Sequence, residues 1–352
     1  MDRTKKEERK LDVLGHIVYS YVHTAVPVSS KTVSRDMESS ISSATVRNIM
    51  SELEEEGYIE QPHTSAGRIP TSIGYRSYAE VAKVRIKLER AEAERLISEY
   101  DKHIRTMKEV IEKTSFLISR QLQNAGIVMW PSIDNLYLKH IELIKIKAET
   151  VLAILVTMTN AVKNYIINLV EDIEKADLEK ITNYINDSYE PDNLSNIAEK
   201  LRERTSGSPE TANDGRVKDF KRTAVSIIDA IFSENIENEI CCDGLNHFIE
   251  ESKFRDLDAT QKFLQVFSER KDITRIMTGE LPYSGIKIYI GEDNMPEALK
   301  DCSVITSGYN LNGRTVGRLG VIGPMRMDYD RALGTIRSLS DIISKKLEEI
   351  NG

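Results

Sequence analysis

Apolar residues recur every three or four positions near the start of the chain, which predicts an amphipathic helix. Pro27 disfavours helical backbone in the residue before it, so this first helix should end there. Ser29 or Ser30 can cap a second, short helix over residues 31–37. The apolar stripe of the first helix consists of Leu11, Leu14, Ile17, Val18, Tyr21 and Val22.

A third helix is predicted from a cap at Ser42 or Ser43 to about residue 56, where Gly57 can end it. A short strand over 58–60, a turn-rich segment and a returning strand over 68–71 follow. Helix, helix, turn, helix and hairpin in this order predict a winged helix-turn-helix over residues 1–80. The buried stripe of the third helix should be Val46, Ile49, Met50 and Leu53.

Residues 77–123 predict one long helix, so residues 81–124 are assigned to a linker. Apolar positions within it alternate spacings of three and four, which is the heptad pattern of a coiled coil. This stripe is either a dimer seam or a face packed on its own domain, and the sequence favours neither. Its members are Ile97, Tyr100, Ile104, Met107, Ile111, Thr114 and Ile118.

The rest of the chain predicts strands, then helices, then strands again, which indicates an α+β domain interrupted by an insertion. Residues 125–175 and 245–352 are assigned to this domain, and residues 176–244 to a helical insertion that we expect to dimerise. Strands are expected at 141–146, 151–157, 165–170, 286–290, 303–309 and 315–322, and a last helix at 329–350.

Composition adds that the 352 residues suit a multidomain globular protein, with 40% hydrophobic and 30% charged residues. The net charge of −8 is unevenly spread, because residues 1–85 hold 12 basic and 12 acidic residues. A neutral first domain with separated charges can bind a polyanion on one side. Without an apolar leader or a membrane-length segment, and with three cysteines, the chain is expected to be cytoplasmic.

The chemistry of the sequence does not suggest an enzyme. The glycine-rich stretch over 313–323 lacks the spacing of a phosphate loop and predicts a tight hairpin. We recognise no catalytic triad, metal-ligand spacing or paired-carboxylate motif, so we expect no catalysis, no metal and no cofactor.

The outward face of the third helix has the residue types of a DNA reader. Arg47 can pair with guanine and Asn48 with adenine, each through two hydrogen bonds. Ser43 and Thr45 at the start of the helix suit phosphate. A solvated helix face without a ligand is the alternative.

Neighbouring residues extend this candidate interface. His63, Ser65 and Arg68 lie in the predicted wing, where Arg68 could contact phosphate or the minor groove. Lys31 on the second helix could contact a phosphate. The four glutamates between positions 52 and 56 would be repelled by DNA unless they are held outside the groove.

Several long runs closely resemble the HrcA family of heat-inducible repressors. Ala25, Ser29 and Ile49 depart from that family's usual residues, and could alter the turn before the second helix and the charge near the third. The runs are VPVSSKT at 26–32, SSATVRN at 42–48, QPHTSAGRIPT at 61–71, GYR at 74–76 and GRLGVIGPMRMDY at 317–329.

The resemblance implies a winged-helix domain, a GAF-like domain with a helical insertion, and a homodimer. It implies binding to an inverted-repeat operator ahead of chaperone genes, double-stranded DNA being the partner. It also implies control by a GroEL-type chaperonin. Two alternatives stay open: a regulator that senses a small molecule through the GAF-like domain, and a scaffold protein built on the heptad stripe.

Overall fold

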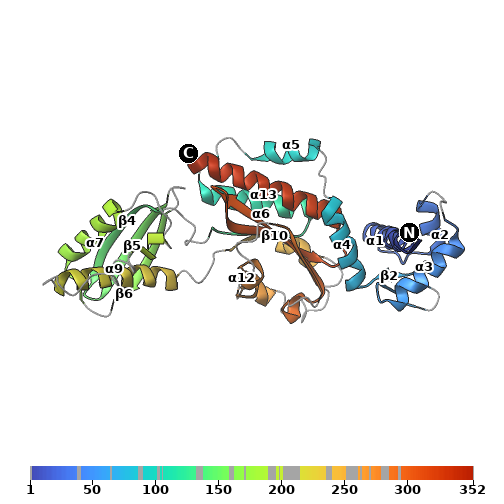
Figure 1. The fold of residues 1–352 in the computed structure, drawn as a ribbon, viewed down its shortest axis with the longest axis horizontal. Coiled ribbons are helices and arrows are strands. Elements are labelled where there is room, and N and C mark those ends of the chain that lie inside the picture. Colours follow the sequence, from blue (N-terminus) through green and yellow to red (C-terminus); the bar gives the residue numbers. More distant parts are fainter. Residues whose placement is uncertain are drawn as a thin grey trace.

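Three parts follow one another along the long axis of the molecule in a computed structural model (Figure 1). We call them the head (residues 2–70), the body (residues 90–131 and 240–351) and the insertion (residues 138–234). Helix α4 (Ser72–Arg85) joins head to body. The structure describes residues 2–37, 41–63, 66–85, 90–100, 104, 106–131, 138–157, 162–169, 172–188, 196–197, 199–200, 215–234, 240–250, 261, 264–268, 271–278, 285–291 and 295–351.

The head consists of three helices and a two-stranded antiparallel sheet, in the predicted order. Their apolar side chains are buried in a cluster that continues through α4 into the body, and a fully buried Leu or Val there contributes about 1.5–3 kcal/mol to stability. Val28, between the first two helices, pairs with Arg68 as an isolated bridge beside the sheet. The elements are α1 (Asp2–Thr24), α2 (Ser30–Asp36), α3 (Ser43–Glu55), β1 (Ile59–Glu60) and β2 (Ile69–Pro70).

The prediction of a single long helix over residues 77–123 is wrong. The chain instead forms α4, α5 (Arg90–Glu99) and α6 (Met107–Leu122). Thr106 caps α6, and the Glu109 side chain accepts a hydrogen bond from the Thr106 backbone in return. This capping box satisfies backbone N–H groups at a new helix start, which a continuous helix would not need.

Most of the heptad stripe is an internal packing face, whereas its first member, Ile97 on α5, is 53% exposed. Tyr100, Met107, Ile111 and Ile118 are at most 4% exposed, and α6 packs against the body's own strands and helices. The Tyr100 hydroxyl, just after α5, is hydrogen-bonded to Thr114 on α6. Of the two alternatives, the structure supports packing within the domain.

The body is built on a five-stranded antiparallel sheet of order β7-β3-β10-β9-β8. Helix α6 and the last helix, α13 (Tyr329–Asn351), pack together against it, and α12 (Lys271–Thr278) contributes to a second apolar cluster. The glycine-rich stretch is in the predicted hairpin, whose turn at Asn312 and Gly313 has the positive φ values of a type I′ turn. The strands are β3 (Ala125–Met129), β7 (Ile240–Asp243), β8 (Lys287–Ile290), β9 (Cys302–Leu311) and β10 (Arg314–Pro324).

The insertion holds a sheet of its own, which corrects the assignment of residues 125–175 to one domain and of the insertion to helices alone. Strands β4 (Leu138–Lys147), β5 (Thr150–Thr157) and β6 (Val162–Asn168) form a separate antiparallel sheet. Helices α7 (Lys175–Ser188) and α9 (Gly215–Glu234) pack on this sheet. Alternation along a strand marks its buried side but not the sheet it joins, so the sequence could not separate β3 from β4.

Candidate nucleic-acid interface

Helix α3 has one buried and one exposed side. Its apolar stripe lies in the core of the head as predicted, with Val46 and Leu53 fully buried. The opposite side exposes Thr45, Arg47 and Asn48. The outer side of α3 therefore carries hydrogen-bonding groups on mostly short side chains.

Two similar caps begin the helices that carry this surface. The Ser29 hydroxyl accepts from the Thr32 backbone N–H at 3.2 Å, and the Ser42 hydroxyl accepts from the Thr45 N–H at 3.1 Å. Each cap satisfies one of the N–H groups that a helix start leaves unpaired. The Ser29 departure from the family pattern thus still gives a well-formed helix start.

A hydroxyl pair connects α2 and α3. The Ser30 hydroxyl is largely buried and lies 3.1 Å from the Ser43 hydroxyl. Ser43 is therefore engaged inside the head, although the sequence suggested it for phosphate. Sequence reasoning offered Ser30 only as an alternative cap of α2 and did not predict this contact, because its partner lies on another helix.

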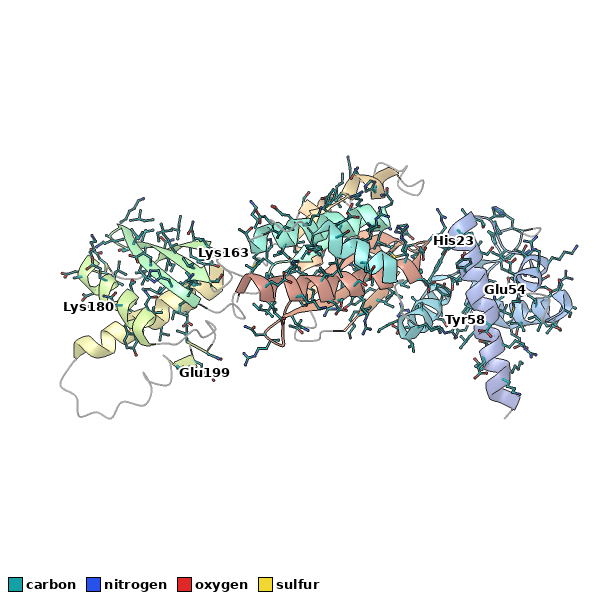
Figure 2. The ribbon with its side chains drawn as sticks, turned by 90° about the horizontal axis from the view of Figure 1, so that it is seen from above. His23, Glu54, Tyr58, Lys163, Lys180 and Glu199 are labelled. Atoms are coloured by element: carbon teal, nitrogen blue, oxygen red, sulfur yellow. The ribbon has the colours of Figure 1, made fainter. Side chains whose placement is uncertain are left out.

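The acidic half of α3 is neutralised by cations from elsewhere in the head. Lys6 Nζ lies 2.9 Å from Glu52, and Lys10 Nζ lies 2.5 Å from Glu56. Glu54, labelled in Figure 2, is paired with a third cation from the hairpin side of the head. The predicted repulsion between this acidic block and DNA is thereby reduced without moving α3.

Lys10 is the most buried of these cations. Burial by itself lowers its pKa, but the hydrogen bond and the charge of Glu56, helped by Glu7, raise the pKa above its usual value. Its side chain is only 8% exposed, so solvent screens this ion pair less than the Lys6–Glu52 pair. Lys6 and Lys10 are one turn apart, as are Glu52 and Glu56, so the two pairs match in spacing. Sequence reasoning missed both lysines because each lies 46 residues before its partner.

Arg68 lies at the base of the hairpin, and its contact with phosphate or the minor groove stays a prediction. Its backbone N–H and C=O are both bonded to Val28 at 2.8 Å. Its guanidinium is 2.8 Å from Glu54, and the side chain is 22% exposed. Gly67 permits this close pairing, since a Cβ there would lie 2.5 Å from the Val28 carbonyl oxygen. Arg68 therefore holds the hairpin to α3.

The remaining predicted residues are distributed over the same domain. Lys31 is exposed on α2, and His63 is exposed in the hairpin turn, where its carbonyl accepts from the Ala66 N–H. Ser65 lies outside the described residues. The structure thus leaves Lys31, Arg47, Asn48 and His63 exposed. Thr45 is also exposed, but its hydroxyl lies 2.9 Å from the Ser42 hydroxyl.

The described ranges offer little for other chemistries. Among them, acidic, histidine and cysteine side chains do not gather into a group able to hold a metal ion. The helices that could be examined include none with both the length and the apolar character of a membrane span.

Comparison with known proteins gives consistent matches over the whole chain. Residues 108–333 match the family model described as the HrcA protein C-terminal domain. The chain is 33% identical to the heat-inducible transcription repressor HrcA of Syntrophobacter fumaroxidans, covering 99% of this chain and 98% of that protein. It is 32% identical to the HrcA of Brevibacillus brevis, covering 97% of each. A crystal structure of a hypothetical protein shares the fold, with a TM-score of 0.62 at 23% identity, over 97% of this chain and 98% of that one.

The relatives that match this chain over almost their whole length belong to the class of transcription regulators. Within that class, the chain belongs to the HrcA family. The relatives named above are called heat-inducible transcription repressors.

Proposed function

We propose that the chain is a sequence-specific DNA-binding repressor of heat-shock chaperone genes, with a winged-helix head and a GAF-like body. The observation that carries this proposal is the charge arrangement on α3. Arg47 and Asn48 are exposed, while three of the four nearby glutamates are paired with Lys6, Lys10 and Arg68. These ion pairs reduce the repulsion that the glutamates would exert on DNA, and the family match supports the same partner.

In this proposal α3 lies in the major groove with its N-terminal half toward the bases. Arg47 donates two hydrogen bonds to guanine, and Asn48 pairs with adenine. Thr45 and the free N–H groups at the start of the helix bind phosphate. Lys31 and His63 contact the DNA backbone on either side of α3. These contacts fix the position of the head along the duplex without reading its sequence.

The homodimer that we propose uses the open face of the insertion's sheet. Ile144, Leu152 and Ile166 form one apolar row across the three strands. Ile144 is 43% exposed and Ile166 is 55% exposed. Apolar surface of this kind is stabilised when a second protein surface covers it. A two-fold dimer would present two copies of α3 to an inverted repeat.

We propose that this repressor responds to heat, because it belongs to the HrcA family. The relatives are named heat-inducible, and we propose that a GroEL-type chaperonin is the partner that keeps the repressor active. Membership of the family supports this partner.

The decisive experiment is a titration of two duplexes at one fixed salt concentration. One carries a palindromic chaperone operator and the other carries a scrambled sequence. We expect the operator to bind more than about 1,000-fold tighter. Equal, weak binding leads to a second titration with purified chaperonin, and equal binding there as well contradicts the proposed function.

A further inference from the structure

The junction between head and body brings the ends of two helices together. The Arg326 guanidinium, from the body, donates a hydrogen bond of 2.9 Å to the Val22 carbonyl in the last turn of α1. The last carbonyls of a helix have no partner within it and form the negative end of its dipole. Arg326 therefore supplies both a donor and a positive charge where α1 needs them.

The start of α13 carries the opposite charge. Asp328 accepts a hydrogen bond from the Arg331 N–H, and Asp330 accepts one from the Tyr78 hydroxyl on α4. His23 Nε2 in the last turn of α1 lies 3.8 Å from Asp328, and Figure 2 shows His23 where the head meets the body. Carboxylates are favourable at the positive end of a helix. The two helix ends thus meet with complementary charges.

Helix α4 is held to the body by further contacts. Arg76 donates to the Ile290 carbonyl of the edge strand β8 at 3.0 Å. The rings of Tyr75 and Tyr329 lie 5.9 Å apart, and both side chains are buried. The same α4 packs on α1 in the head. The connection between head and body is therefore a packed joint.

We propose that Arg326, Tyr78 and Arg76 are positioning residues that fix the orientation of the head and so select the spacing between operator half-sites. The proposal rests on the proposed function. Each added base pair moves a half-site by about 3.4 Å and rotates it by about 34°. A rigid joint tolerates one spacing, whereas a loose joint lets each head find its half-site independently. The segment over residues 325–329, for which the sequence suggested no role, supplies this joint.

The test uses the full-length protein and a series of operators whose spacers differ in length, together with a duplex carrying one half-site. For the wild type we expect a 5-base-pair insertion to weaken binding by about 100-fold, because it turns the half-site through half a helical turn. The double variant Arg326→Ala, Tyr78→Phe should lose less than about 10-fold on that insertion. Its affinity for the single half-site should stay within about two-fold of wild type.

Matched variants separate positioning from folding. Arg337→Ala removes an exposed arginine from the same helix α13 and should keep the wild-type spacing preference. Arg326→Lys keeps a cationic donor and should restore part of it. Arg76→Ala removes the hydrogen bond to β8 and loosens the joint from that side. If melting by circular dichroism shows that the double variant is unfolded, Arg76→Ala takes its place in the test.

The outcomes distinguish this proposal from the proposed function. A wild-type spacing preference in folded joint variants overturns the positioning role and leaves DNA reading intact. A lower half-site affinity with unchanged spacing preference also overturns it. A wild type that does not separate operator from scrambled DNA, with and without chaperonin, overturns both.

Discussion

The head and the insertion each expose a face of a regular element, but the two faces differ in chemistry. On the head, α3 exposes Arg47 and Asn48, which can form hydrogen bonds. On the insertion, the β4–β6 sheet exposes Ile144 and Ile166, which cannot. A hydrated polar surface gives specificity when it is matched by bases, whereas an apolar surface gives affinity when it is covered. Under the proposed function the two faces therefore take separate ligands, DNA for the head and a second copy of this chain for the insertion.

The largest predicted effect comes from placing a charge on the apolar face. Ile166→Asp puts a carboxylate on the edge strand β6, at one end of the apolar row with Leu152 and Ile144, where dimerisation would bury it without a partner. We expect a monomer by light scattering at concentrations where the wild type is a dimer. Operator affinity should fall by more than about 100-fold, because two linked heads bind far more tightly than one.

The control for this variant is Asn183→Asp, which adds the same charge to an exposed position on α7. It should leave the dimer and the operator affinity unchanged. A dimeric Ile166→Asp protein would contradict the assignment of this face and move the dimer contact elsewhere.

Removing Arg47 tests the other face. Arg47→Ala should weaken operator binding by about 1–3 kcal/mol while hardly changing binding to random DNA, because the lost hydrogen bonds read a base. Titrations on both duplexes measure the two losses. Arg9→Ala, which removes an exposed arginine of α1, is the matched control. Equal losses on both duplexes would show that Arg47 contacts phosphate.

Local patterns predicted local structure well. The buried stripe of α3 follows from 3.6-residue periodicity, and the turn at Asn312 and Gly313 follows from the preference of these residues for positive φ. The break before α6 was also readable, because Thr106 and Glu109 have the spacing of a capping box. The heptad stripe concealed this break, since its apolar positions continue in sequence from α5 into α6.

Contacts between distant segments could not be predicted in the same way. Whether Arg68 projects from the hairpin or pairs with Glu54 depends on how the hairpin packs on α3. The neutralisation of Glu56 depends on a lysine 46 residues earlier in the chain. Both pairings follow from tertiary packing, which brings together residues that no local spacing relates.

The turn between α1 and α2 provides a smaller test within the head. Ala25 has a φ of 55°, a conformation that disfavours a side chain by roughly 1–2 kcal/mol. Glycine also has more conformational freedom in the unfolded chain, which offsets part of this gain. The net effect of Ala25→Gly should be a stabilisation of about 0.5–1 kcal/mol. Gln123→Gly, at φ 52° after α6 in the body, should gain less because it loses a hydrogen bond to the Arg120 carbonyl.

Thermal or urea unfolding of the two glycine variants beside the wild type measures both changes. A lower stability of Ala25→Gly would mean that contacts of the Ala25 methyl group outweigh its backbone strain.

The smallest effect concerns the buried phenols of the joint. Burial raises the pKa of Tyr75 above its usual value of 10.0, with the charge of Arg326 opposing this in part. The unfolded chain therefore releases this proton first, and the free energy of unfolding falls as the pH rises through 10. For one such tyrosine the loss between pH 9 and pH 10 is about 0.4 kcal/mol. Urea unfolding at both values should show a smaller loss in Tyr75→Phe than in the wild type, and equal losses would mean that Tyr75 ionises as readily in the folded protein as in the unfolded chain.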